Sequence, residues 1–263
     1  MIYSFVGKGG VGKTTVASAV ALYLASKGKT VIISSDFMSS LTHIFSEKIE
    51  NLTVVEVKER DVADRWKERY GREVSMILKQ FVDVDDWIVD HIARSPGVPE
   101  EFMISNVVDF ELSGEYEYVV WDTAASSSTM HLLLLEREFY EHLERDVKIF
   151  LKIRDRFHSD KVLELLEEWK DLAVKVWKQL LLTKFFLVTT MDSLSLLQSD
   201  EIADDLKSMG INIAGKICNR CEASSEDQFL FSIPEMRGSA RDIVDSIREE
   251  ILEGSGFGRL LNL

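Results

Sequence analysis

The stretch of sequence that decides the fold lies close to the N-terminus and reads Gly7-Lys8-Gly9-Gly10-Val11-Gly12-Lys13-Thr14. It matches the pattern G-x-x-x-x-G-K-[ST], whose glycines allow backbone turns that other residues avoid, so that successive N–H groups point at a phosphate. An apolar run, Ile2–Val6, precedes the loop, and a helical pattern over residues 14–27 follows it. This order of strand, loop and helix is the context in which the pattern binds phosphate, whereas the bare pattern arises by chance in about one chain in a hundred of this size.

The residue types of the loop predict ATP and Mg²⁺ as its ligands. The helix that starts near Lys13 directs its positive dipole end at the same anion. Lys13 is expected to neutralise the β- and γ-phosphates, and the Thr14 hydroxyl to coordinate Mg²⁺. The residues expected to contact the nucleotide here are Gly9, Gly10, Val11, Gly12, Lys13, Thr14 and Thr15.

Four further apolar runs are continuous rather than alternating, as expected for strands of a parallel sheet that is covered on both faces. They are Thr30–Ser34, Tyr118–Trp121, Phe185–Thr189 and Ile213–Cys218. Apolar residues at helical spacing recur between them, over residues 62–81, 139–151 and 162–180. The alternation predicts an α/β fold with a doubly wound, mostly parallel sheet that carries the P-loop.

We expect one P-loop ATPase domain over residues 1–263, because no stretch is linker-like or of low complexity. Two connections, about residues 57–116 and 130–182, are longer than a single crossover helix requires. We interpret both as helical insertions that pack together beside the sheet as an α-helical subdomain.

The composition disfavours some classes of partner and of location. The chain has 31 Lys and Arg residues against 45 Asp and Glu, with a formal net charge of -14, which argues against nucleic acid and anionic lipid surfaces. No apolar run approaches the roughly 18–20 residues that span a bilayer, so we expect no integral membrane segment. Ile2–Val6 follows no basic leader and is interpreted as a strand rather than a signal peptide. Two cysteines cannot form a disulfide framework, which fits a cytoplasmic protein.

The string from Lys8 to Thr15 resembles the deviant Walker A motif of the ATPase class that includes arsenical-pump ATPases, tail-anchored-protein targeting ATPases and the Min/Par partition ATPases. The resemblance implies a homodimer in which Lys8 reaches across the interface to the partner's phosphates. A cation delivered in this way stabilises charge in the transition state, as an arginine finger does. The alternative is that Lys8 is a solvated surface lysine.

Two further segments are similar to the switch regions of the arsenical-pump and tail-anchored-targeting branch. Residues 34–41, Ser-Ser-Asp-Phe-Met-Ser-Ser-Leu, resemble switch I, which implies that Asp36 polarises the attacking water. Residues 122–129, Asp-Thr-Ala-Ala-Ser-Ser-Ser-Thr, resemble switch II, which implies that Asp122 holds Mg²⁺ through water. Either aspartate could instead cap a helix. Phe37, Ala125 and Ser127 depart from the proline, proline and glycine of the family pattern.

Four weaker similarities follow in the family's order along the chain, at Ser95–Glu100, Asp192–Leu196, Asn219–Arg220 and Pro234–Gly238. The resemblance implies that Asp192 faces the dimer partner, that Asn219 binds adenine through its amide, and that Pro234 lies near the base.

Cys218 and Cys221 have the spacing of half a zinc site, but we favour a buried strand-end thiol and a loop thiol. In the targeting ATPases a methionine-rich groove holds a client transmembrane helix. Here the eight methionines are scattered. The apolar faces of the helices could therefore either pack in the core or form a groove for a membrane protein or another hydrophobic segment.

The motifs together predict an enzyme that hydrolyses ATP to ADP and phosphate to switch between closed and open dimers, coupled to a client protein through its helices. The departures at Phe37, Ala125 and Ser127 prompt one alternative, a nucleotide-gated chaperone or adaptor with little or no hydrolysis. A partition-type ATPase on DNA or membrane is the other, and the acidic composition disfavours it.

Overall fold

In the computed structural model the chain divides into two compact units, and each is described here by itself. Unit 1 comprises residues 1–56, 107–130 and 181–263, and unit 2 comprises residues 57–106 and 131–180. The structure describes residues 1–36, 41–56, 58–79, 87–94, 98–124, 160–221 and 229–253.

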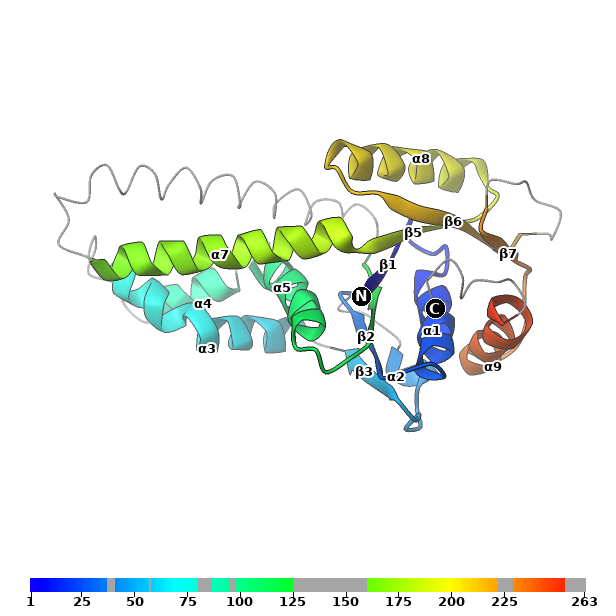
Figure 1. The fold of residues 1–263 in the computed structure, drawn as a ribbon, viewed down its shortest axis with the longest axis horizontal. Helices are drawn as coiled ribbons and strands as arrows, with labels where there is room; N and C mark the ends of the chain where they lie inside the picture. The colour runs from blue at the N-terminus through cyan, green and yellow to red at the C-terminus, as the bar shows by residue number, and fades with distance from the viewer. Residues whose placement is uncertain are drawn as a thin grey trace. The chain divides into compact units, whose positions relative to one another are not determined.

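Unit 1 is built on a parallel sheet that has seven strands among the described residues (Figure 1). The strands are β1 (Ile2–Val6), β2 (Thr30–Ser34), β3 (Leu52–Glu56), β4 (Tyr118–Asp122), β5 (Lys184–Thr189), β6 (Ile213–Asn219) and β7 (Phe231–Ile233). Their order across the sheet is β3-β2-β4-β1-β5-β6-β7, and each neighbouring pair is parallel. The predicted α/β class with a parallel sheet is therefore confirmed. Because β1 is central, the loop that follows it opens at the middle of the sheet's carboxyl edge, where ligands of such sheets bind.

The five predicted strands lie within one residue of their predicted bounds, whereas β3 and β7 were not predicted. Both lie at the edges of the sheet. Most residues of β3 are only half-buried, and β7 has three residues. Neither therefore has the long apolar run that identifies a buried strand.

Helix α1 (Lys13–Ala25) provides much of the core of unit 1, and its residues from Val16 to Ala25 are all buried. It packs against β4, α9 (Ala240–Ser246) and the π-helical turn η2 (Ile247–Leu252). Helix α8 (Ser193–Ser208) packs instead on β5 and β6, and Figure 1 shows it on the opposite side of these strands from α1. The short helix α2 (Leu41–Ile44) contributes Leu41 and Ile44 to the core on the α1 side. Helices thus cover both faces, as in a doubly wound sheet.

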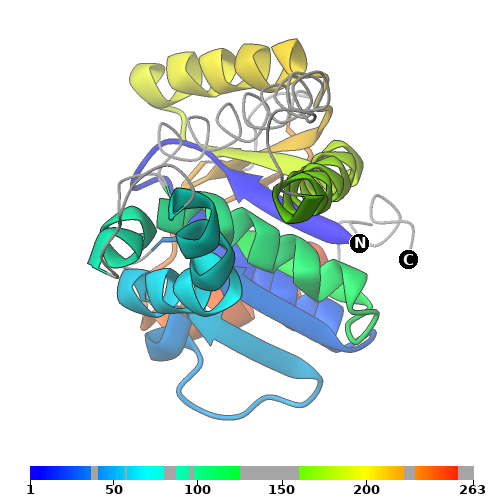
Figure 2. The same ribbon diagram turned by 90° about the vertical axis from the view of Figure 1, so that its left-hand side faces the viewer.

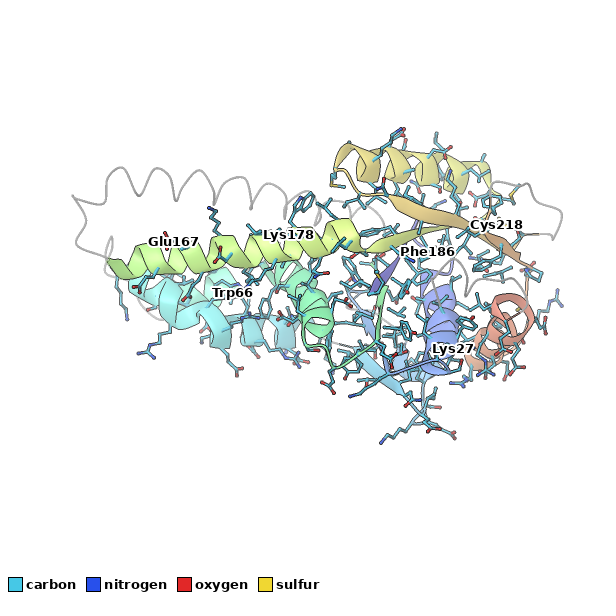
Figure 3. The ribbon with its side chains drawn as sticks, viewed as in Figure 1. Lys27, Trp66, Glu167, Lys178, Phe186 and Cys218 are labelled. Carbon is cyan, nitrogen blue, oxygen red and sulfur yellow. A yellow bond between two sulfur atoms is a disulfide. The ribbon has the colours of Figure 1, made fainter. Side chains whose placement is uncertain are left out.

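The central strands contact one another through stacked aromatic rings. Phe5 of β1 and Phe186 of β5, which is labelled in Figure 3, stack with ring centroids 5.4 Å apart, and both side chains are fully buried. Trp121 of β4 packs edge-on against Phe185 at 6.3 Å. Such pairs add to the apolar burial that holds β4, β1 and β5 together beneath the loop.

Unit 2 contains only helices among its described residues: α3 (Glu59–Leu78), α4 (Trp87–Ala93), α5 (Val98–Leu112), which runs on into unit 1, and most of α7 (Asp160–Leu182). Helices α3 and α4, both cyan, lie side by side in Figure 1 and Figure 2 and are joined by an ion pair between Lys67 and Asp90. Tyr70 packs edge-on against Phe102 of α5 at 5.9 Å.

These helices fall within the predicted insertions at about residues 57–116 and 130–182. The helix predicted over residues 139–151 lies outside the described residues. The predicted organisation, one ATPase domain over residues 1–263 with a helical subdomain, stays a prediction. Within the part of the chain that the structure describes, each helix is either too short or too polar to cross a lipid bilayer.

Candidate functional site

The glycine-rich loop that follows β1 contains two glycines, Gly7 and Gly12, at which a side chain would not fit. Gly12 caps α1 with φ 93° and ψ 30°, in the left-handed region that residues with a Cβ atom avoid. A Cβ atom on Gly12 would lie 2.2 Å from Asn219 Nδ2, and one on Gly7 would lie 2.1 Å from the carbonyl oxygen of Val188. The loop is therefore packed directly against the ends of β5 and β6, which fix its conformation.

Lys13 is the first residue of α1, and its side chain is only 8% exposed. Its Nζ donates to the carbonyl oxygens of Gly7 at 3.0 Å and Lys8 at 3.2 Å, so the amino group lies inside the curve of the loop. Burial lowers the pKa of Lys13, and the nearby carboxylates of Asp122 and Asp36 act in the opposite direction. A buried cation at a helix N-terminus makes this loop a strong site for an anion.

Asp122 ends β4 and lies between Phe5 of β1 and Ser34 of β2 in the strand register. Its Oδ2 accepts hydrogen bonds from Thr14 Oγ1 at 2.9 Å and from Ser34 Oγ at 3.1 Å. Its Oδ1 is buried and accepts no hydrogen bond from the described residues. Burial raises the pKa of Asp122 to about 7, although both hydrogen bonds and Lys13 act to lower it.

The oxygen atoms of Thr14 and Asp122 fit a divalent cation that prefers hard ligands. Mg²⁺ is held by one or two protein oxygens and completes its octahedron with water and phosphate. The unsatisfied Oδ1 of Asp122 is a buried acceptor of the kind such an ion, or its bound water, would satisfy. Among the described residues no three His, Cys, Asp or Glu side chains converge on one point, so a closed metal cage is not formed there.

The segments that follow β2 and β4 are tied together by Ser34 and Ser35, whose structural roles were not predicted. Ser35 Oγ accepts from Trp121 Nε1 at 3.0 Å and from the backbone N–H of Ala124 at 3.4 Å. Ser34 Oγ accepts from the backbone N–H of Asp36 at 3.2 Å while it donates to Asp122. Two serines directly before Asp36 were the available signal.

Asp36 is half-buried, and its charge acts on both Lys13 and Asp122. Asp36, the residue predicted to polarise water, is thus close enough to Lys13 and Asp122 for its charge to affect their pKa values. Phe37, Ala125 and Ser127, the three departures from the family pattern, lie outside the described residues.

Lys8 pairs within its own chain. Its Nζ lies 3.8 Å from Asp192 Oδ1, with Lys8 29% and Asp192 54% exposed. Asp192 also caps α8, where it accepts from the backbone N–H of Ser195 at 2.9 Å and from the Thr190 hydroxyl. Hydrogen bonds from Ser195 and Thr190, with a smaller contribution from Lys8, hold the pKa of Asp192 well below its usual range. The two charges line an open groove of about 420 Å³ beside the loop.

Asn219 and Arg220, at the end of β6, contact the outer side of the loop. Asn219 Nδ2 donates to the carbonyl oxygen of Val11 at 2.7 Å, and its Oδ1 accepts from the backbone N–H of Arg220 at 3.1 Å. Arg220 Nη2 donates to the carbonyl oxygen of Gly10. One N–H and one lone pair of the Asn219 amide are used in this way, and one of each is left over for a base edge.

The remaining predicted residues lie where the sheet's carboxyl edge continues. Pro234 directly follows β7 and is exposed, and Thr15 lies half-buried in the first turn of α1. Of the weaker similarities, Ser95–Gly97 lie outside the described residues.

The expectation of two unpaired thiols is wrong, because Cys218 and Cys221 form a disulfide. Cys218, labelled in Figure 3, lies in β6, and both cysteines are buried. Arg220 between them has φ 58°, a left-handed turn that brings the two Cα atoms to 5.8 Å, within the range that a disulfide spans. Spacing alone does not reveal such a turn. In this state neither sulfur is a thiolate that could bind zinc.

Comparisons with known proteins agree with this geometry. A family model described as "Anion-transporting ATPase" matches residues 1–251. The "Putative arsenical pump-driving ATPase 2" of Aquifex aeolicus is 30% identical over 250 residues, which cover 87% of this chain and 83% of that protein. The "Arsenical pump-driving ATPase" of Escherichia coli is 27% identical over 219 residues, 81% of this chain but 33% of that protein. "ATPase GET3C" of Arabidopsis thaliana is 26% identical over 269 residues, with coverages of 87% and 69%. The chain thus spans about a third of the Escherichia coli relative.

The raised pKa of Asp122 predicts how the stability of the protein without magnesium and nucleotide depends on pH. The folded state keeps this proton up to about pH 7, whereas the unfolded chain loses it near pH 4. Between these values the folded state binds more protons, so the contribution of Asp122 to the free energy of unfolding falls as pH rises. By pH 8 the buried ionised carboxylate costs roughly 2–4 kcal/mol.

Asp122→Asn keeps an acceptor for Thr14 and Ser34 but does not ionise. We expect its thermal midpoint to exceed that of the unsubstituted protein by roughly 5–10 °C at pH 8 and by little at pH 5. Differential scanning calorimetry in chelator measures both, with the exposed α8 residue in Asp204→Asn as the matched control. An equal difference at the two pH values would show that Asp122 is not the titrating group.

Proposed function

The chain belongs to the family of anion-transporting ATPases, and from this premise we propose that it hydrolyses Mg-ATP as a homodimer that closes around nucleotide and opens after hydrolysis. The observation that carries the proposal is the convergence of Lys13, Thr14 and Asp122 at one end of the central strands.

The loop binds the phosphates through its backbone. The N–H groups of residues 9–15 and the positive end of α1 surround the β- and γ-phosphates. Lys13 now donates to two loop carbonyls, and the same ammonium group can exchange these bonds for phosphate oxygens without leaving the loop. A charge-assisted bond to phosphate is stronger than a bond to a neutral carbonyl, so the exchange favours binding.

Thr14 and Asp122 would hold the magnesium ion. Bound magnesium would neutralise charge on the phosphates as it builds up. For this role Asp122 must give up its proton, and the approach of a cation lowers the pKa that burial raises. The Thr14 hydroxyl, which donates to Asp122 Oδ2, would turn a lone pair to the metal.

Asp36 is proposed to orient and polarise the attacking water. Its charge acts on both Lys13 and Asp122, and Ser34 links the Asp36 backbone to the Asp122 carboxylate. A change in the ligands of Asp122 would therefore be felt at Asp36. This link offers a route by which loss of the γ-phosphate alters the segment after β2.

Lys8 is proposed to act on the phosphates of the second subunit. Its pairing with Asp192 spans 3.8 Å and is partly exposed, so it contributes little energy to holding Lys8 in place. Asp192 is already satisfied by Ser195 and Thr190 and loses little if Lys8 leaves. Closure of the dimer would move Lys8 from Asp192 to the partner's nucleotide and complete the transition-state charge stabilisation.

Asn219 is proposed to bind adenine through the N–H and the lone pair of its amide that the loop does not use, and Pro234 is proposed to lie beside the base.

The helical unit, residues 57–106 and 131–180, is proposed to couple the nucleotide cycle to a protein client. This client would be a membrane protein or would present another hydrophobic segment. We place the cycle in the cytoplasm, where ATP is available. A nucleotide-gated adaptor with little hydrolysis is the second candidate, favoured by the substitutions at Phe37, Ala125 and Ser127.

Removing the charge of Asp36 separates the two candidates. Asp36→Asn is expected to lower ATP turnover by at least about 100-fold, because the water loses its polarising carboxylate, while Mg-ATP affinity changes little. Phosphate release and nucleotide titration measure the two quantities, and Asp204→Asn is the control. Turnover that persists in Asp36→Asn removes this residue from the mechanism, and turnover that is negligible in the unsubstituted protein favours the adaptor.

A mixture of two variants tests whether Lys8 acts across the interface. Lys8→Ala and Asp36→Asn subunits are each expected to be inactive alone. In a mixed dimer the Lys8→Ala subunit keeps its own Asp36 and receives Lys8 from its partner, so one site of two works. An equal mixture should then recover about a quarter of the normal turnover.

Light scattering in Mg-ATP should report a particle of twice the 30.0 kDa chain mass. Lys178→Ala, which removes an exposed lysine of α7, is the matched control for Lys8→Ala. A mixture that stays inactive although mixed dimers form would mean that Lys8 acts within its own subunit.

A further inference from the structure

Residues 218–221 run from the last two residues of β6 into a bend at Arg220, called the turn below, and the disulfide between Cys218 and Cys221 closes it. Arg220 has φ 58°, a conformation that a residue with a Cβ atom adopts only when its surroundings hold it there. The backbone N–H of Cys221 donates to the carbonyl oxygen of Ile233 at 2.8 Å, which fastens the end of the turn to β7. The disulfide and this bond together hold Arg220 in its left-handed conformation.

Both residues enclosed by the disulfide donate hydrogen bonds to the backbone of the glycine-rich loop. Asn219 Nδ2 donates to the carbonyl oxygen of Val11, and Arg220 Nη2 donates to that of Gly10. In a trans peptide the carbonyl and the next N–H point in opposite directions. Holding the carbonyls of Gly10 and Val11 from the outside therefore directs the N–H groups of Val11 and Gly12 towards the inside of the loop.

We propose that residues 218–221 are a thiol-sensitive clamp, in which the Cys218–Cys221 disulfide holds Asn219 and Arg220 against the loop and so keeps the amides of Val11 and Gly12 aimed at the nucleotide's phosphates. The clamp rests on the proposed function, because it acts through nucleotide binding. Arg220 is a positioning residue in this account, and Asn219 positions the loop in addition to its proposed contact with adenine. Opening the disulfide weakens nucleotide binding.

The reaction that opens the clamp is exchange with a dithiol reductant. A thiolate of the reductant attacks one sulfur of the disulfide and forms a mixed disulfide, which the second thiol of the reductant then cleaves. Cys218 and Cys221 are released as thiols after gaining two electrons and two protons, and the reductant leaves as its own disulfide. In a cytoplasmic protein a disulfide is more often redox-responsive than permanent, which fits a clamp that is meant to open.

The burial of both sulfurs sets how the clamp responds. Cys218 is fully buried and Cys221 is 2% exposed. A reductant therefore reaches the disulfide only when the turn opens. Because Asn219 and Arg220 belong to that turn, bound nucleotide and a closed clamp stabilise one another, and nucleotide is expected to slow reduction.

The test compares the disulfide and thiol forms of the full-length protein. Calorimetric titration with Mg-ATP is carried out on protein purified without reductant and on protein treated with a dithiol, with thiols counted by alkylation and mass. We expect Kd and the KM for Mg-ATP to rise about tenfold on reduction, with kcat within about twofold. A loss of general structure would instead lower kcat and the thermal midpoint together.

Three variants control the comparison. Cys218→Ser with Cys221→Ser should bind like the reduced protein and ignore the reductant. Cys218→Ser alone should do the same and serves if the double variant folds poorly. Arg220→Gly fits the left-handed turn and keeps the disulfide, but it lacks the bond to Gly10, so it should bind Mg-ATP more weakly even when oxidised.

Equal affinities in the two redox states, or two free thiols in protein purified without reductant, overturn the clamp and leave the proposed function intact. Absence of Mg-ATP binding in both states overturns the proposed function instead. Slower appearance of alkylated cysteines under a dithiol reductant when Mg-ADP is present supports the coupling, and an unchanged rate contradicts it.

Discussion

The site depends on one constraint, which is that the backbone from Gly7 to Thr14 is held in a shape that only glycine permits. Gly12 takes a left-handed conformation against Asn219, and Gly7 lies against the carbonyl of Val188. Because the loop follows β1, at the middle of the sheet, the ends of β4, β5 and β6 all meet it. This arrangement brings the side chains proposed to bind the nucleotide to one edge of the sheet.

Two buried ionisable groups, Lys13 and Asp122, make the site sensitive to charged ligands. Burial lowers the pKa of Lys13 and raises that of Asp122, so the charged form of each group is costly without a ligand and would be stabilised by the ligand proposed for it, phosphate for Lys13 and magnesium for Asp122. Ser34 passes the state of Asp122 on to the backbone of Asp36. Lys8 within the loop is held loosely by Asp192, whereas Asn219 and Arg220 donate hydrogen bonds to the loop backbone. In the proposed function, the inner surface of the loop responds to the nucleotide, while Lys8 serves a second subunit and the Cys218–Cys221 disulfide responds to thiols.

The sequence was sufficient for those features that local pattern determines. The loop, the five inner strands and the α/β class follow from glycine spacing and from continuous apolar runs, and Asp122 was found because residues 122–129 resemble the family's switch II. The edge strands β3 and β7 were missed because they lack a long apolar run. The disulfide depends on the left-handed backbone of Arg220, and the contacts of Ser34 and Ser35 depend on the pairing of β2 with β4. Those are tertiary facts that spacing along the chain does not encode.

The most direct test of the account is isothermal titration calorimetry of the purified protein with ATP, ADP and AMP in magnesium. If the loop, Lys13 and the start of α1 surround the terminal phosphates as proposed, ATP and ADP should bind with micromolar affinity and AMP at least about 100-fold more weakly. The Lys13→Ala substitution should reduce the affinity for ATP to that for AMP. Equal binding of AMP and ATP, or ATP binding that is unaffected by Lys13→Ala, would contradict the claim that this loop holds a nucleotide by its phosphates.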